Sequence, residues 1–257
     1  MRRFLCFILF VLISFVGFSQ ESGPFKFLGI PVDGTQSQFV SQLRTKGFTY
    51  NSRNDGYRGQ FNGKTVDVFI HTNHNLVDRV MVEFPGTTER EIRIQFNQLL
   101  SQFNESSKYM DLDFNEVIPD DEDISYEMLV HDKRYQASFY YFDQGRDLSE
   151  FSNALLDKLS GLLPTDMYNR IKESTAYYLT LSDAERNQVS EVVAQEFEPA
   201  MEAMDDDEKV RMVLAYMTAM QDIADGNVWF MIDDSDGPYQ ILLFYDNPRN
   251  RAHGEDL

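Results

Sequence analysis

The sequence predicts an α+β protein with a mainly antiparallel sheet of about six or seven strands, packing helices and an inserted helical segment. Three observations predict this class. Apolar residues recur with a period near 3.6 in some segments and near 2 in others. Short turns join neighbouring period-2 segments, as in antiparallel hairpins. One long helical stretch separates the last two strands from the rest.

The chain after residue 24 is expected to begin with a short strand and a loop, followed by a helix and three strands. Thr35 can cap a helix that carries Phe39 and Leu43 and ends at Gly47. The turn Asn62-Gly63 and a slightly longer one, Asn73-His74-Asn75, are expected to join the strands that follow. These strands are predicted at Tyr57–Phe61, Thr65–Ile70 and Val77–Phe84. Apolar residues alternate along them, so one sheet face should be buried and the other wetter.

A second helix and further strands repeat this plan. The helix is predicted at Thr88–Phe103, with apolar residues at helical spacing. Two strands are expected after a polar stretch, at Ile124–His131 and Arg134–Phe142.

A helical pattern then extends from 148 to 225 before the chain returns to strands. One of its helices is expected to start at Ser182, in a capping box with Glu185, and to end or kink at Pro199. The returning hairpin pairs Asn227–Ile232 with Tyr239–Tyr245, so the helical segment is interpreted as an insertion between two hairpins of one sheet. The predicted organisation is a signal peptide at 1–19, helix-plus-sheet units at 20–147, a helical insertion at 148–225, a hairpin at 226–246 and a polar tail at 247–257.

The N-terminus has the pattern of a cleavable secretory signal peptide. Arg2 and Arg3 precede an apolar stretch from Phe4 to Phe18, which leads into the small-x-small sequence Gly17-Phe18-Ser19. At about fifteen residues the stretch is short for a membrane span. We therefore expect an exported protein, periplasmic or secreted, with no transmembrane anchor after cleavage. Because Cys6 is the only cysteine, disulfides are not expected in the mature chain.

The formal net charge of −19 bears on possible partners. Nucleic-acid binding needs a basic stripe, and none is visible. The expected partner is a protein or a glycan in the cell envelope or outside the cell. No cofactor is expected.

An acidic stretch partly matches a calcium-binding loop. Asp111, Asp113, Asn115 and Glu122 occupy positions one, three, five and twelve of such a loop. Position six is Glu116 where the sharp turn needs glycine, and the residues after Glu122 are predicted as a strand. An ordinary acidic loop is the favoured interpretation, and a calcium-stabilised structural protein is an alternative.

Three segments carry a resemblance to known proteins: Phe27–Thr35, Ile118–Met128, and the C-terminal residues from Tyr245 to Leu257. Together they resemble an uncharacterised family of secreted proteins common in gut anaerobes, which implies no catalytic residue. The helix-then-strands plan is similar in outline to beta-lactamase-inhibitor-protein-like folds and to small outer-membrane assembly lipoproteins. Such a fold-level likeness implies architecture and not activity.

No catalytic signature stands out. There is no Gly-x-Ser-x-Gly elbow, no Ser-x-x-Lys and no phosphate-binding glycine loop. Carboxylates are abundant, so an envelope or secreted hydrolase that uses paired carboxylates is an alternative function.

The leading hypothesis is an exported binding or interaction protein without catalytic activity. Methionines gather near the last two helices and aromatic residues gather in the last hairpin, and both residue types are common at binding surfaces. The methionines are also expected in a methionine-rich core, which is the favoured interpretation of their positions. The interaction candidates are Met212, Met217, Met220, Trp229, Tyr239 and Tyr245.

Overall fold

A computed structural model describes residues 23–111, 115–143, 148–161, 163, 165–180, 205–235 and 238–251. The predicted signal peptide, the capping box at Ser182 and Pro199 lie outside these residues. The chain divides into two compact units. The sheet unit comprises Pro24–Phe142 and Asp225–Leu257, and the helical unit takes in Asp143–Ala224. No helix in the described part of the chain is both long enough and apolar enough to cross a membrane.

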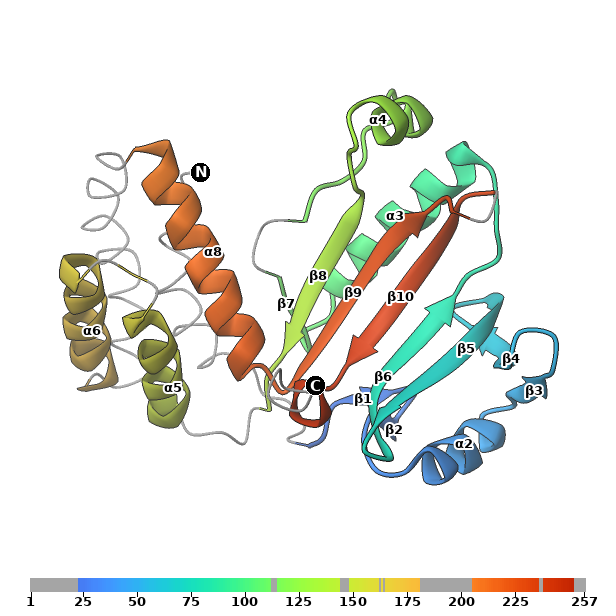
Figure 1. Ribbon diagram of the computed structural model, residues 1–257, viewed down its shortest axis with the longest axis horizontal. Helices are drawn as coiled ribbons and strands as arrows, with labels where there is room; N and C mark the ends of the chain where they lie inside the picture. Colours follow the sequence, from blue (N-terminus) through green and yellow to red (C-terminus); the bar gives the residue numbers. More distant parts are fainter. Residues whose placement is uncertain are drawn as a thin grey trace. The chain divides into compact units, whose positions relative to one another are not determined.

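The sheet unit is built on an eight-stranded antiparallel sheet, which confirms the predicted α+β class (Figure 1). The strand order is β3-β4-β5-β6-β10-β9-β8-β7, and a separate two-stranded sheet pairs β1 with β2. The strands are β1 Lys26–Phe27, β2 Ile30–Pro31, β3 Thr49–Asn51, β4 Gly56–Phe61, β5 Lys64–Asn73, β6 Leu76–Glu83, β7 Met110–Asp111, β8 Gln136–Tyr141, β9 Gly226–Asp233 and β10 Gln240–Asp246.

Two tight turns set the register of β4, β5 and β6. Asn62 and Gly63 both have positive φ, at 49° and 73°, and join Phe61 to Lys64 as predicted. His74 and Asn75 likewise have positive φ, at 46° and 64°, so the second turn has two residues and is tighter than expected. Positive φ at both central positions matches the right-handed twist of the flanking strands.

Helix α2 (Gln36–Thr45) begins after its predicted cap, Thr35, and α3 (Glu89–Asn104) begins within one residue of its predicted start. The Thr35 side chain accepts from the Gln38 N–H and the Gln38 side chain bonds back, which completes a capping box. Thr88 caps α3 in the same manner, through the Glu91 N–H. Gly47 has a φ of +89° just beyond α2, a conformation that glycine adopts without strain.

One predicted strand is wrong. Ile124–Val130 forms helix α4, not a strand, because Asp123 caps it through the Tyr126 N–H and because Ile124 and Met128, one turn apart, are both buried. The following strand, β8, is shorter than predicted. The short strands β3 and β7 were not expected from the sequence.

The core lies on one face of the sheet, where α3 covers β9 and β10 (Figure 1). Phe96 of α3 packs edge-on against Phe230 of β9, with ring centroids 5.0 Å apart. Phe103 stacks on Phe139 of β8 at 5.1 Å. The opposite face carries Trp229 and Phe244, together with charged residues such as Arg79 and Asp246. This separation of the two faces follows the alternation of side chains along each strand.

The helical segment interrupts two neighbouring strands. β8 pairs with β9, Ala137 opposite Phe230, although the whole helical unit separates them in sequence. The Asp225 N–H donates to the Tyr141 carbonyl at 2.9 Å and closes the base of the insertion. The described helices of the unit are α5 Leu148–Ser160, α6 Thr165–Thr180 and α8 Asp206–Ile223, and α5 packs against the other two.

Residues 247–250 do not trail from the fold as the predicted polar tail would. They include the short 3₁₀ helix η1, Pro248–Asn250. Asn247 is buried and donates to the Val32 carbonyl at 2.7 Å. The Asn250 side chain bonds to Asp33 and to the Val77 carbonyl, each at 2.8 Å. Amide side chains therefore hold this part of the C-terminal segment against the start of the sheet unit.

Candidate interaction site

Residues Asn115–Tyr135, here called the α4 segment, connect β7 to β8 and contain α4 at the top of the sheet unit (Figure 1). Ile118, Ile124, Met128 and Tyr135 are buried and belong to the main hydrophobic core. These four side chains attach the segment to the sheet unit, so the residues between them are held on a fixed base.

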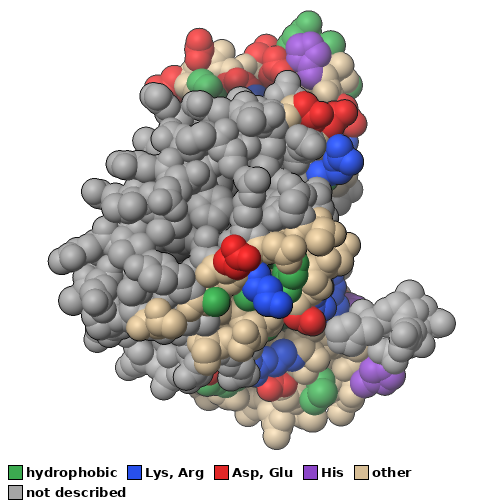
Figure 2. All heavy atoms as spheres, turned by 90° about the vertical axis from the view of Figure 1, so that its left-hand side faces the viewer, with side chains coloured by type: hydrophobic (Ala, Val, Ile, Leu, Met, Phe, Trp, Pro, Cys, Tyr) green, Lys and Arg blue, Asp and Glu red, His purple; other side chains and the backbone are tan. Residues whose placement is uncertain are grey.

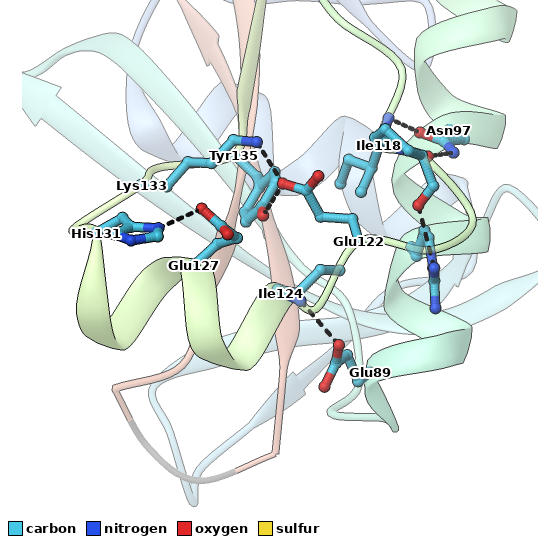
Figure 3. Close-up of polar contacts among 11 residues, drawn as sticks. Glu89, Asn97, Ile118, Glu122, Ile124, Glu127, His131, Lys133 and Tyr135 are labelled. Carbon is cyan, nitrogen blue, oxygen red and sulfur yellow. Dashed lines mark hydrogen bonds and ion pairs between the residues drawn. The ribbon is translucent and has the colours of Figure 1, made fainter.

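Three polar side chains of α3 bind the main chain of the α4 segment (Figure 3). Asn97 accepts from the Ile118 N–H and donates to the Ile118 carbonyl, both at 2.9 Å. Arg93 donates to the carbonyls of Pro119 and Asp120. Glu89 accepts from the Ile124 N–H at 2.8 Å. In an exposed loop, such main-chain groups would usually form hydrogen bonds with water. Here they form them with the side chains of one rigid helix.

A second group of contacts lies within the segment (Figure 3). Glu122 accepts from the Lys133 ammonium and from the Tyr135 hydroxyl, the latter at 2.6 Å. Lys133 lies over the Tyr135 ring, 5.0 Å from its centroid. The Lys133 bond, and after it the Tyr135 bond, lowers the pKa of Glu122. Burial, and after it the Glu122 bond, raises the pKa of Tyr135. Glu122 is thereby held ionised and ties the two ends of α4 together.

This geometry predicts an acid-sensitive segment. The folded-state pKa of Glu122 lies below its ordinary value of 4.5. The contribution of Glu122 to the stability of the segment is therefore complete above pH 4.5 and is lost as the pH falls through the lower folded-state pKa. Between about pH 6 and about pH 3.5, we expect hydrogen-exchange protection at the amides of Ile124 to Val130, corrected for intrinsic rate, to fall a few-fold. Glu122→Gln should be less protected at the higher pH and change little with pH. An equal pH response in Glu122→Gln would contradict the assignment to this carboxylate.

The α4 segment exposes large apolar side chains. Nine large apolar side chains are exposed among the described residues, and four of them belong to this segment: Val117, Tyr126, Leu129 and Val130, at 65%, 51%, 85% and 54%. Tyr126, Leu129 and Val130 share one face of α4, because they are three and four positions apart, opposite buried Ile124 and Met128. These three residues are here called the α4 patch. Figure 2 shows apolar, acidic and histidine side chains gathered at the top of the view, over α4.

The residues of the candidate calcium loop are only partly together. The Asn115 amide donates to Asp111 at 2.7 Å and to the Ser138 carbonyl at 3.0 Å. Glu122 instead binds Lys133 and Tyr135, and Asp113 lies outside the described residues. The residues after Glu122 form a helix, so the strand expected there was wrong. The residues that the structure describes contain no group of three His, Cys, Asp or Glu side chains placed for a metal ion.

The predicted interaction residues are dispersed. Met220 is buried and Met217 half-buried in α8, while the Met212 side chain lies outside the described atoms. Tyr245 is buried, its ring near those of Phe25 and Phe27. Tyr239 is half-buried against the core. Tyr245 and Met220 therefore offer no surface to a partner in this structure.

Trp229 lies on the sheet face opposite α3, in a closely packed cluster. It is half-buried and stacks on Phe244, with ring centroids 4.0 Å apart. Its indole N–H donates to Asp246 at 2.9 Å, and Arg79 donates twice to the same carboxylate, at 2.6 and 2.8 Å. The donors and the acceptor of this cluster satisfy one another.

An open hollow of about 580 Å³ lies beside β4, β5 and β6. Its lining includes two carboxylates, Asp67 and Glu83, which face each other across β5 and β6. Arg58 donates to Asp67 through Nε and Nη2 at 2.9 and 2.5 Å, and this bond lowers the pKa of Asp67. A general acid needs a raised pKa, so Asp67 is set for ion pairing and not for proton donation at neutral pH.

The sequence held a signal for α4 that the period-2 interpretation overlooked. Asp123 is a favoured capping residue, and Ile124 and Met128 are one helical turn apart. A helix at this position would have placed Tyr126, Leu129 and Val130 on the opposite, solvent-facing side.

Searches against protein-family models, curated proteins and solved structures find no match to this chain.

Proposed function

We propose that this protein is an exported, non-catalytic binding protein that engages another protein through the α4 patch. The observation that carries the proposal is the exposure of Tyr126, Leu129 and Val130 on a segment that α3 and the core hold in place. Apolar side chains gathered on one exposed face are typical of interaction sites. A surface that is already ordered also loses less conformational entropy on binding.

A protein is a better-fitting partner than a glycan. Sugars are commonly bound on flat aromatic rings, whereas two of the three patch residues are aliphatic and the third is a single tyrosine. Trp229 and Phe244 would make a better sugar platform, but they stack on each other and Phe244 is buried. Leu129 and Val130 would instead fill apolar depressions of a protein surface.

The location outside the cytoplasm is part of the same proposal. It is supported by the leader pattern in residues 1–19 and by the resemblance of Phe27–Thr35 and Ile118–Met128 to a family of secreted proteins. The two alternatives have weaker support. Both oxygens of the Asp67 carboxylate are bound by Arg58, and the Asn115 amide is already bonded to Asp111 and Ser138.

The test compares two double variants that remove the same side chains from different places. Leu129→Ser with Val130→Ser replaces two residues of the α4 patch, and Val210→Ser with Leu214→Ser replaces one valine and one leucine that are also exposed, on α8. Each chain, without its leader, is immobilised and exposed to envelope and culture extracts of its producer. We expect a protein that the wild type and the α8 variant retain, and that the patch variant loses by about tenfold or more.

Two outcomes would contradict the proposal. One is that the patch variant retains the same proteins as the wild type. The other is that the two double variants lose them equally, since that would indicate nonspecific apolar adhesion. Both variants change exposed residues, so their melting temperatures should stay close to that of the wild type.

A further inference from the structure

The α4 segment is strongly acidic. It contains seven acidic residues and only two basic ones, Lys133 and Arg134. Both basic residues are paired inside the segment, Lys133 with Glu122 and Arg134 with Asp132 at 2.7 Å. The acidic residues are Glu116, Asp120, Asp121, Glu122, Asp123, Glu127 and Asp132. The segment therefore has an excess of negative charge after its own ion pairs are formed.

The excess charge lies at the surface next to α4. Asp120 and Asp121 are exposed, and they precede the Asp123 cap of the helix. Arg93, the cation that approaches them from α3, donates to the main-chain carbonyls of Pro119 and Asp120. Within the part of the chain that the structure describes, neither carboxylate forms an ion pair, and both lie just before the first turn of α4.

The apolar contacts alone make a weak complex. Full burial of a side chain of this size contributes about 1.5–3 kcal/mol, and association costs at least about 4 kcal/mol in lost freedom of motion. A partner that covers three such side chains therefore gains little unless it also makes favourable polar contacts. A neutral partner would add a desolvation cost at the carboxylates, whereas a cationic one would offset it.

We infer that the partner of the α4 patch presents an apolar groove flanked by lysine or arginine residues. This inference rests on the proposed function and specifies its partner. Electrostatic attraction would raise the association rate and orient the groove over Leu129.

The charge of the segment also disfavours other occupants. In a symmetric dimer of this chain through the α4 patch, two acidic segments would face each other and repel. An anionic membrane surface would repel the segment as well. A separate protein with a basic rim is the occupant that the charges fit.

The test uses two synthetic amphipathic helical peptides that share one leucine face. Lysines flank this face in one peptide and glutamates in the other. Each is titrated into the isotope-labelled chain, without its leader, and binding is followed by NMR at the amides of the α4 segment. We expect the lysine peptide to shift these amides, the glutamate peptide to bind at least about tenfold more weakly, and the lysine peptide to weaken about tenfold between roughly 50 and 500 mM NaCl.

A matched pair of variants localises the effect. Asp120→Asn with Asp121→Asn neutralises two charges beside α4, and Asp157→Asn with Glu173→Gln neutralises two exposed charges in the helical unit. Only the first pair should weaken binding of the lysine peptide, by about threefold to tenfold. Equal binding of the two peptides, equal effects of the two variants, or shifts confined to other amides would overturn the inference.

The inference and the proposed function fail separately. Suppose that capture of a natural partner requires Leu129 and Val130 but does not change with salt concentration or with the Asp120 and Asp121 substitutions. The inference is then overturned and the proposed function stands. If the lysine peptide binds the α4 segment as expected but no extract protein depends on the patch, the proposed function is overturned.

Discussion

Replacing Phe230 by alanine is expected to lower the free energy of unfolding of the sheet unit by about 3–5 kcal/mol. Phe230 is fully buried on β9, in the middle of the sheet. Its ring packs against those of Phe96 and Phe103 of α3 and Phe139 of β8. Alanine would leave a cavity between the sheet and its covering helix, which neither can close without moving.

The measurement is denaturant unfolding followed by tryptophan fluorescence. Trp229 is the only tryptophan of the chain and lies in the sheet unit, so its emission reports that unit. Tyr126→Ala, which removes an exposed aromatic ring, should change the free energy of unfolding by no more than about 0.5 kcal/mol. A Phe230→Ala effect as small as that of Tyr126→Ala would show that α3 does not pack on β9 as described.

The second large effect is expected from Asp246→Ala. The Asp246 carboxylate accepts two bonds from Arg79 and one from the Trp229 indole, and it is only 11% exposed. Its removal leaves a half-buried guanidinium and an indole N–H without their hydrogen-bond acceptor. This should lower the free energy of unfolding by about 2–3 kcal/mol. The same fluorescence-detected unfolding measures this loss, with the free-energy change taken from the denaturant midpoint.

Asp67→Ala is the matched control for that change. Asp67 also accepts two bonds from one arginine, but Arg58 is 53% exposed against 34% for Arg79. Water can replace the lost partner of Arg58 more easily, so we expect roughly half the effect of Asp246→Ala. An equal or larger loss in Asp67→Ala would contradict the role assigned to the Arg79, Asp246 and Trp229 cluster.

Local signals in the sequence were sufficient for much of the sheet unit. Thr35 is a capping residue and α2 begins directly after it, while helical spacing of apolar residues placed α3. Asn62-Gly63 allowed the hairpin between β4 and β5 to be placed to the residue, because few other pairs adopt two positive φ angles. The insertion could be inferred because strands of similar pattern lie before and after it.

The α4 segment could not be assigned from periodicity alone. Ile124, Tyr126, Met128 and Val130 alternate as a strand would, while Ile124 and Met128 also fit one helical turn. Seven residues are too few to separate the two periods. Tertiary contacts favour the helix, since Glu89 binds the Ile124 N–H and the core buries Ile124 and Met128 together.

The interaction candidates were chosen by residue type, which does not say which face a side chain occupies. Tyr245 shares its face of β10 with Ile241 and Leu243, and all three are buried. In the strand predicted at Ile124–His131, nothing distinguishes Leu129 and Val130 as exposed residues. Placing the patch at the surface required the helix, for which Asp123 is a signal in the sequence and the folded contacts are the deciding evidence.

The interrupted pairing of β8 with β9 has a consequence for how the protein is synthesised. During translation, β8 leaves the ribosome before β9, one of its two neighbours, and must wait until the whole helical unit and then β9 have been made. Until then the nascent sheet has an unpaired apolar edge at Ala137 and Phe139, the kind of edge that pairs wrongly with other chains. If the leader directs export as expected, keeping the chain unfolded until it has crossed the membrane would delay exposure of that edge until β9 can cover it.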